Sequence, residues 1–200
     1  VDYTRIDYDP ASGAVSLPEG MEIDLGSVAK GYAGREAAQL LRQAGVSSAL
    51  LNLGGNIQTV GSRPDGDPWQ IGVKDPSTGQ PMMVLSIRDQ AVVTSGGYER
   101  YFQQDGRTYW HIMDPATGRP AESGLRSVTI VGDDGLVCDG LSTALFVIGL
   151  ERAAQFWAGS DDFEAIFVTD DGSVYLTQGL TDRFALTQDH ADTPVQVIQR

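Results

Sequence analysis

A helical pattern of apolar residues stands out between residues 29 and 44. The recurring apolar positions are Ala29, Ala33, Ala37, Leu40, Leu41 and Ala44. Their spacing of three to four residues places them on one face of a helix. Ser27 is a candidate N-cap for this helix, and Gly45 follows where helices commonly end. Two further helices are predicted, at residues 139 to about 148 and at residues 151–157.

Short runs of β-branched and aromatic residues occupy much of the remaining chain and are separated by Gly, Pro and Asp. Such runs predict strands, and two runs around a turn predict a hairpin. Single strands are predicted at residues 21–25, 49–53, 57–60, 69–73, 83–87, 91–94 and 127–131. Hairpins are predicted over residues 1–17, 98–112 and 165–176.

This mixture of strands with a few helices predicts one α+β domain with mainly antiparallel sheets and packed helices. The length of 200 residues and the 41% hydrophobic content suit a single domain with a real core. We expect the domain to span residues 1–188 and the polar residues 189–200 to form a loose tail.

Composition and charge argue against some classes of function. A formal net charge of −13, with no basic face visible in the sequence, argues against a nucleic-acid partner. An acidic protein can still bind an anionic ligand if a metal ion supplies positive charge. Cys138 is the only cysteine, so an internal disulfide is excluded. No apolar run approaches the roughly 18 residues of a membrane span. We expect no signal peptide within these residues. We also expect a segment upstream, because the chain opens inside an apparent strand.

One of the two histidines, His111, stands where an aromatic run meets a rigid turn at residues 114–118. Pro115 fixes φ there, and Gly118 tolerates positive φ. This placement makes His111 a candidate catalytic residue, whereas a lone histidine on a strand is often structural. A zinc site and a Ser-His-Asp hydrolase are both unsupported, because metal-ligand pairs and a Gly-x-Ser-x-Gly elbow are absent from the sequence.

Two glycine-containing segments follow predicted strands. Residues 24–31 lead into the first helix, whose N-terminus offers free N–H groups to an anion, with Lys30 in its first turn. The alternative is a capped helix with a solvated lysine. Gly54 and Gly55 could let a ligand approach the backbone, or could form a bulge or a turn. Residues 94–100 hold a second glycine pair, Gly96-Gly97, for which a structural role is slightly favoured.

Asp139 and Thr143 are four residues apart on a predicted helix, so they share one face. A carboxylate and a hydroxyl are the hard oxygen ligands that suit Mg²⁺, which keeps positions open for substrate oxygens and water. The alternative is an Asp N-cap followed by an ordinary helical threonine.

These segments occur in an order that resembles the FAD:protein FMN transferase (ApbE) family, over residues 1 to about 178. The matching motifs are Asp-Leu-Gly-Ser-Val-Ala-Lys-Gly-Tyr at 24–32, Asn-Leu-Gly-Gly-Asn at 52–56, Thr-Ser-Gly-Gly-Tyr at 94–98, His-Ile-Met-Asp-Pro-Ala-Thr-Gly at 111–118 and Asp-Gly-Leu-Ser-Thr-Ala at 139–144. Each motif is modest alone, but five in register make the resemblance specific.

The resemblance implies an ApbE-like fold related to the T-fold, and an enzyme that binds FAD and Mg²⁺. Such enzymes transfer FMN to a Ser or Thr hydroxyl of a target protein and release AMP. It further implies acceptors that are flavoprotein subunits of membrane redox complexes. The expected location is the bacterial cell envelope, at the outer face of the cytoplasmic membrane or in the periplasm, with a possible lipid anchor upstream.

The resemblance also implies roles for individual residues. The metal ligands are the side chains of Asp139 and Thr143 and the backbone carbonyl of Ser27. His111 is the candidate acid/base. The residues expected to contact FAD are Asp24, Lys30, Gly54, Gly55, Trp110 and His111.

Family members usually carry roughly a further third of chain before the segment at residue 24, which this sequence lacks. Two other functions stay open. One is a Mg²⁺-dependent FAD pyrophosphatase, in which water replaces the protein hydroxyl. The other is a flavin-binding protein without turnover.

Overall fold

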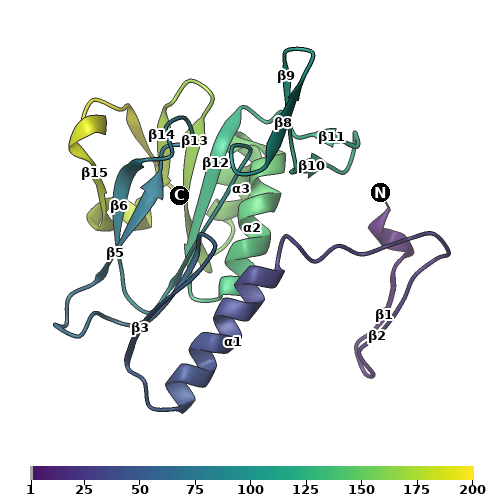
Figure 1. Ribbon diagram of the computed structural model, residues 1–200, viewed down its shortest axis with the longest axis horizontal. Helices are drawn as coiled ribbons and strands as arrows, with labels where there is room; N and C mark the ends of the chain where they lie inside the picture. The colour runs from purple at the N-terminus through teal and green to yellow at the C-terminus, as the bar shows by residue number, and fades with distance from the viewer. Residues whose placement is uncertain (1) are drawn as a thin grey trace.

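A seven-stranded sheet forms the centre of the computed structural model, which describes residues 2–200; Val1, at the start of the first expected hairpin, lies outside the described residues (Figure 1). All neighbouring strands are antiparallel except the parallel pair β14–β16. From edge to edge the strands are β16 (Val195–Ile198), β14 (Val174–Thr177), β13 (Phe163–Thr169), β12 (Leu125–Gly132), β7 (Ala91–Gly96), β4 (Asn56–Gly61) and β3 (Ser48–Leu53).

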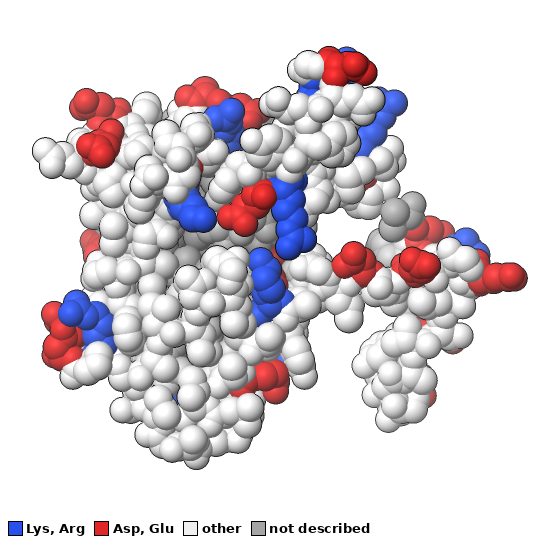
Figure 2. All heavy atoms as spheres, in the orientation of Figure 1, with Lys and Arg blue, Asp and Glu red and all other residues white. Residues whose placement is uncertain are grey.

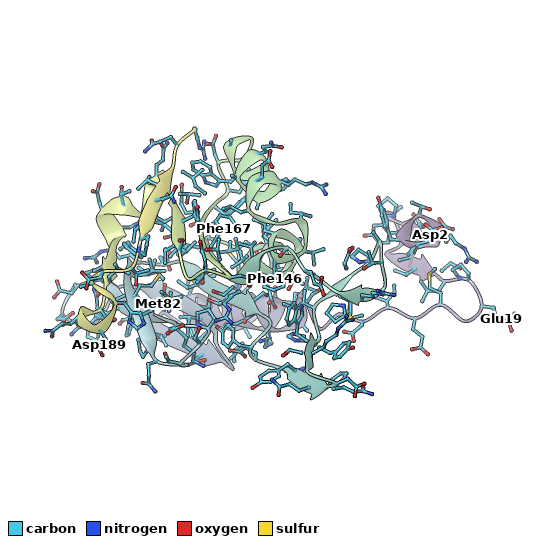
Figure 3. All side chains as sticks on the ribbon, turned by 90° about the horizontal axis from the view of Figure 1, so that it is seen from above. Asp2, Glu19, Met82, Phe146, Phe167 and Asp189 are labelled. Atoms are coloured by element: carbon cyan, nitrogen blue, oxygen red, sulfur yellow. The ribbon has the colours of Figure 1, made fainter. Side chains whose placement is uncertain are left out.

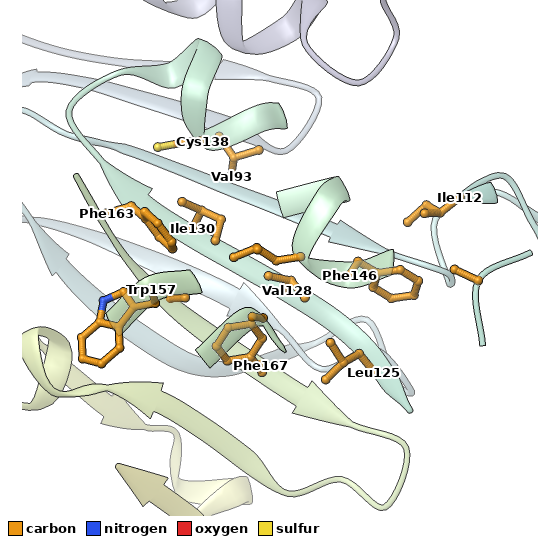
Figure 4. Packing of buried hydrophobic residues seen from close by; sticks show 14 of the residues in the cluster. Val93, Ile112, Leu125, Val128, Ile130, Cys138, Phe146, Trp157, Phe163 and Phe167 are labelled. Atoms are coloured by element: carbon orange, nitrogen blue, oxygen red, sulfur yellow. The ribbon is translucent and has the colours of Figure 1, made fainter. Parts of the chain in front are cut away.

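Three helices cover one face of this sheet: α1 (Ala29–Gln43), α2 (Gly135–Ile148) and α3 (Leu150–Ala158). Phe146 and Trp157, from α2 and α3, are fully buried against β12 and β13 (Figure 4). Along β13, Phe163 and Phe167 point to this helix layer. Their spacing follows from the alternation of side chains along a strand.

A three-stranded sheet covers the opposite face, in the order β15 (Phe184–Leu186), β6 (Pro81–Ile87) and β5 (Trp69–Lys74). Met83 and Leu85 of β6 are fully buried against Ile166 and Leu176 of the large sheet. The domain therefore has three layers, and the α+β class with mainly antiparallel sheets is confirmed.

Smaller elements lie at the periphery. The hairpin of β1 (Asp7–Asp9) and β2 (Ala14–Ser16), which follows the 3-10 turn η1 (Tyr3–Arg5), stands apart from the body; Asp2 and Glu19 mark it in Figure 3. A second hairpin pairs β8 (Tyr101–Gln104) with β9 (Arg107–Trp110), and β10 (Met113–Asp114) pairs with β11 (Arg119–Pro120). Between residues 2 and 200, none of the helices has the length and apolarity to cross a membrane.

The helix predicted at residues 29–44 and the strands predicted from residue 49 onward are confirmed. The strand predicted at residues 21–25 is wrong. This stretch is mostly exposed, and within the described chain no neighbouring strand pairs with its backbone. An extended segment without such a partner does not become a strand.

The structure corrects the predicted starts of two helices, α1 and α2. The N-cap residue of α1 is Val28 rather than Ser27, and it makes no side-chain capping bond. Helix α2 begins at Gly135, one turn before the expected Asp139, because the Asp134 side chain accepts hydrogen bonds from the amides of Leu136 and Val137. Gly45 does follow α1, with φ of 82°.

The C-terminal segment is more ordered than the expected loose tail. Residues 178–183 and 188–190 form the 3-10 turns η2 (Gln178–Arg183) and η3 (Gln188–His190). Beyond them, β16 pairs in parallel with β14, from Val174 opposite Val195 to Thr177 opposite Ile198. Backbone pairing and the packing of Ile198 on the core hold a segment whose composition is polar.

The turn after His111 occurs three times in the molecule, at residues 9–13, 75–79 and 114–118, each reading Asp-Pro-x-Ser/Thr-Gly. In each copy the Asp carboxylate accepts from the amide two residues on and from the hydroxyl three residues on. The Gly amide donates to the Asp carbonyl at 2.8 Å in all three, and each Gly has φ between 66° and 71°. These five residues therefore form a self-contained turn.

Candidate active site

Helices α1 and α2 cross at an unusually short distance, because a glycine lies on each side. A Cβ atom at Gly31 would come within 2.1 Å of the Gly135 carbonyl oxygen and 2.6 Å of the Asp139 Cβ. A Cβ atom at Gly135 would lie 2.7 Å from the Gln58 Oε1. Only glycine fits at position 31, where a Cβ would meet backbone, and at Gly135 a Cβ would also lie 3.0 Å from the Gly31 carbonyl oxygen. The motifs at residues 24–32 and 139–144 therefore meet at this helix crossing.

Replacement of Gly31 by Ala is expected to destabilise the protein by about 3 kcal/mol or more, because the new methyl group meets backbone that cannot move alone. Gly34, one turn later on α1, is the matched control. Its Cβ would make ordinary contacts of 3.5 and 3.6 Å, so Gly34→Ala should stabilise the helix by about 0.5–1 kcal/mol. Equal urea concentrations at the midpoint of unfolding for Gly31→Ala and Gly34→Ala would contradict the close crossing.

At this crossing the Asp139 side chain contacts the first turn of α1. Its Oδ2 accepts a hydrogen bond of 2.7 Å from the Gly31 amide. That amide is one of the N–H groups that a helix leaves without an internal partner, and the helix dipole there favours a negative charge. Asp139 therefore caps α1 from another helix, which explains why Val28 has no capping side chain.

The Ser27 carbonyl is also free. Ser27 precedes the N-cap residue Val28, so it lies outside α1. The Gly31 amide is the one in the first turn that could reach back to it. Here it donates to Asp139, and no backbone amide among residues 2–200 donates to the Ser27 oxygen. Ser27 itself is exposed at the entry to α1. Its carbonyl oxygen is thus available to a ligand beside the Asp139 carboxylate.

Thr143 lies one turn after Asp139 and belongs to a group of three hydroxyls. Its Oγ1 is 3.0 Å from the Ser95 Oγ, which is 2.8 Å from the Ser142 Oγ. Ser142 in turn donates to the backbone carbonyl of Asp139 at 2.8 Å. Ser95 comes from β7, so this group ties the strand to α2.

The donors fit the Mg²⁺ that the family resemblance implies. Asp139 is only 4% exposed and has no Lys, Arg or His partner in the described chain. A buried carboxylate with one amide partner favours a cation at its remaining oxygen. No cluster of three His, Cys, Asp or Glu side chains occurs among the described residues, so a site here must also use hydroxyl and carbonyl oxygens.

The two expected FAD contacts before α1 are both exposed. The Asp24 Oδ1 accepts a hydrogen bond of 2.6 Å from the Gly26 amide and so shapes the entry to the helix. Lys30 lies in the first turn of α1, next to Gly31 and beside Asn56 and Gln58 around a small hollow. The structure therefore gathers Lys30, Gly31 and Asp139 at one helix end.

Gly54 and Gly55 form the two-residue turn between β3 and β4, with φ of 61° and 96°. Positive φ at both positions is the conformation that tight hairpins favour. The Asn52 side chain accepts from the Gly55 amide at 2.9 Å. The turn alternative for this glycine pair is thus correct; a Cβ at either position would meet open space, and the expected FAD contact stays a prediction.

His111 lies between two anchored neighbours. Trp110 donates from Nε1 to the Ala121 carbonyl at 3.1 Å, and its ring lies against Gly97. Ile112 is buried in the core cluster that includes Phe146 of α2 (Figure 4). The exposed His111 ring is therefore held in place by the packing on either side of it.

The tautomer of the neutral His111 ring follows from its one hydrogen bond. Its Nδ1 is 3.3 Å from the Arg100 carbonyl oxygen, which can only accept. Nδ1 therefore carries the hydrogen, and Nε2 has the free lone pair. A ring in this state can take a proton at Nε2, as a general base must.

A family model described as "ApbE family" matches residues 1–167, most of the chain. The chain belongs to the ApbE family. Among curated relatives, the FAD:protein FMN transferase of Klebsiella pneumoniae is 42% identical over 168 residues, covering 83% of this chain and 51% of its own. That of Treponema pallidum is 41% identical over 175 residues, covering 82% and 48%.

Solved structures agree with this membership of the ApbE family. The ApbE protein from Thermotoga maritima superimposes with a TM-score of 0.82 at 35% identity, covering 89% of this chain and 58% of its own. The flavin transferase ApbE from Vibrio cholerae gives 0.78 at 30% identity, covering 91% and 59%. This ApbE-family chain thus spans about half the length of the curated relatives it matches.

The overall charge gives this ApbE-family chain little attraction for an anion. Its formal net charge is −13, and basic and acidic side chains are interspersed on the face in Figure 2. Positive potential for an anionic ligand must therefore be local. Lys30 and the N-terminus of α1 are local sources of positive potential in the structure.

Four residues of the site were not singled out from the sequence for these roles. Gly31 and Gly135 allow the helices to meet, Ser95 bonds to the Thr143 hydroxyl, and Ser142 bonds to Ser95. A signal existed for Ser95, which lies within the Thr-Ser-Gly-Gly motif, but a loop of that composition has many structural uses. The partner of Gly31 could not be inferred without the helix crossing, and the partner of Ser142 on β7 could not be inferred without the packing of that strand on α2.

Proposed function

We propose that the protein containing this chain transfers FMN from FAD to a Ser or Thr hydroxyl of a target protein and releases AMP. The observation that carries the proposal is the Asp139 carboxylate, which is buried, lacks a basic partner in the described chain and lies at the N-terminus of α1. Membership of the ApbE family and the names of the relatives support the same activity.

In this reaction, the acceptor oxygen forms a bond to the FMN phosphorus, and the phosphorus–oxygen bond to AMP breaks. The acceptor hydroxyl loses its proton, which the free Nε2 of His111 can accept. Negative charge grows on the phosphoryl oxygens and on the AMP that leaves. Lys30 and the positive end of the α1 dipole are the proposed groups that stabilise this charge.

We also propose that Mg²⁺ is held by the Asp139 carboxylate, the Thr143 hydroxyl and the Ser27 carbonyl. When bound, Mg²⁺ would neutralise charge on the pyrophosphate oxygens. Asp24, Lys30, Gly54, Gly55 and the segment at Trp110 and His111 are the proposed FAD contacts.

Mass spectrometry can test the proposed transfer. The intact protein is incubated with FAD, Mg²⁺ and a target polypeptide that carries an acceptor Thr. A covalent FMN adduct on the Thr, together with AMP, is the expected result. Free FMN and AMP without any adduct would instead indicate a pyrophosphatase, and intact retained FAD would indicate a flavin carrier; either outcome would overturn the proposal.

The biological setting is part of the proposal. Acceptors are expected to be flavoprotein subunits of membrane redox complexes. The enzyme is expected at the outer face of the cytoplasmic membrane or in the periplasm, and a lipid anchor upstream of this segment is part of the proposal. The family resemblance supports this setting. Recovery of the native protein in the cytosol after cell fractionation would contradict it.

A further inference from the structure

We propose that Ser95 is a positioning residue that turns the proton of the Thr143 hydroxyl away from the metal. This inference rests on the proposed function, since it assigns Thr143 to Mg²⁺. Ser95 is half-buried at the end of β7 and lies 3.0 Å from the Thr143 Oγ1. It reaches α2 across the packing of the strand and the helix, so it can act on the metal ligand without contacting the metal.

The direction of each hydrogen bond among the Thr143, Ser95 and Ser142 hydroxyls follows from the number of protons that each hydroxyl can donate. Each hydroxyl has one proton to donate. Ser142 donates its proton to the Asp139 carbonyl oxygen, which can only accept. The 2.8 Å bond between Ser142 and Ser95 must therefore use the Ser95 proton.

The remaining bond is then fixed as well. Ser95 has no second proton, so its 3.0 Å bond with Thr143 must use the proton of Thr143. The chain runs in one direction, from Thr143 to Ser95 to Ser142 and to the Asp139 carbonyl. The lone pairs of the Thr143 oxygen are left free for a cation.

Without Ser95, nothing in this chain of bonds holds the Thr143 proton. A helical threonine can then turn its hydroxyl to a carbonyl three or four residues earlier, or direct the proton toward the cation. Residues that orient a metal ligand in this way typically change metal affinity by about 10- to 100-fold when replaced. Ser95→Ala is therefore expected to weaken Mg²⁺ binding by about tenfold.

Isothermal titration of MgCl₂ into the FAD-loaded intact protein measures this effect, and the Mn²⁺ EPR spectrum gives a second readout. Ser95→Thr keeps the hydroxyl and should restore the affinity. Ser142→Ala frees the Ser95 proton to point at Thr143, so an intermediate loss is expected although Ser142 does not bond to Thr143. Thermal unfolding confirms that each variant is folded.

Thr94→Ala is the matched control. Thr94 precedes Ser95 on β7, and its hydroxyl bonds to that of Thr129 at 2.8 Å, on the opposite face of the strand. It should leave Mg²⁺ affinity unchanged. Equal losses of Mg²⁺ affinity in Thr94→Ala and Ser95→Ala would overturn the role of Ser95. Wild-type Mg²⁺ affinity in Ser95→Ala, together with a loss in Thr143→Ala, would do the same. Neither result would affect the proposed function. Wild-type protein without Mg²⁺ affinity would overturn this inference and the Mg²⁺ part of the proposed function together.

Discussion

Asp139→Ala is expected to abolish Mg²⁺ binding and to lower FMN transfer by about 10³-fold or more, since a metal at the phosphoryl oxygens contributes several kcal/mol to such reactions. The same variant should lower the free energy of unfolding by about 1–3 kcal/mol, because the buried Gly31 amide loses its acceptor. One side chain thus has a chemical role and a structural role.

Asp139→Asn separates these two roles. The amide oxygen of Asn can still accept from Gly31, so stability should stay close to that of wild type. The negative charge is lost, so Mg²⁺ affinity and transfer should fall as in Asp139→Ala. Calorimetric titration, urea unfolding and the adduct assay measure the three quantities. Unchanged Mg²⁺ affinity in both variants would remove Asp139 from the proposed metal site.

His111→Ala is expected to slow FMN transfer by about 10²- to 10⁴-fold, the usual contribution of a positioned acid or base. The FAD dissociation constant should change far less, because His111 is exposed and its proposed task is to take a proton. Single-turnover transfer and FAD titration measure the two effects separately.

The second histidine provides the control for this prediction. His190 bonds through Nδ1 to Thr187 at 3.0 Å and lies 3.4 Å from the Asp75 carboxylate, next to the three-stranded sheet. His190→Ala should leave the rate of transfer unchanged. Equal losses of FAD affinity and transfer rate in His111→Ala would assign His111 to binding only.

Local patterns in the sequence were enough to predict the parts of the site that depend on local geometry. The 3.6-residue period predicted α1, and the spacing of Asp139 and Thr143 placed both side chains on one helix face. The Asp139–Gly31 bond joins residues 108 apart, so no window of sequence could contain it. The role of Asp139 as the cap of α1 therefore needed the structure.

The errors have the same physical origin. Residues 21–25 have the composition of a strand but find no pairing strand among residues 2–200, whereas residues 195–198 form β16 because β14 offers one. Strand formation depends on a neighbour that a single run of residues does not reveal. Ser27 was expected to cap α1 because its residue type suits an N-cap, whereas a distant carboxylate fills that place.

The Asp-Pro-Ala-Thr-Gly turn at residues 114–118 has two near-copies, at residues 9–13 and 75–79, and the same bonds close all three. What distinguishes the third copy is His111, which precedes it. A motif search that gives weight to these five residues thus detects a common hairpin turn. We therefore expect His111 together with Asp139 and Gly31, which no turn requires, to discriminate this kind of site in genome sequences better than the turn does.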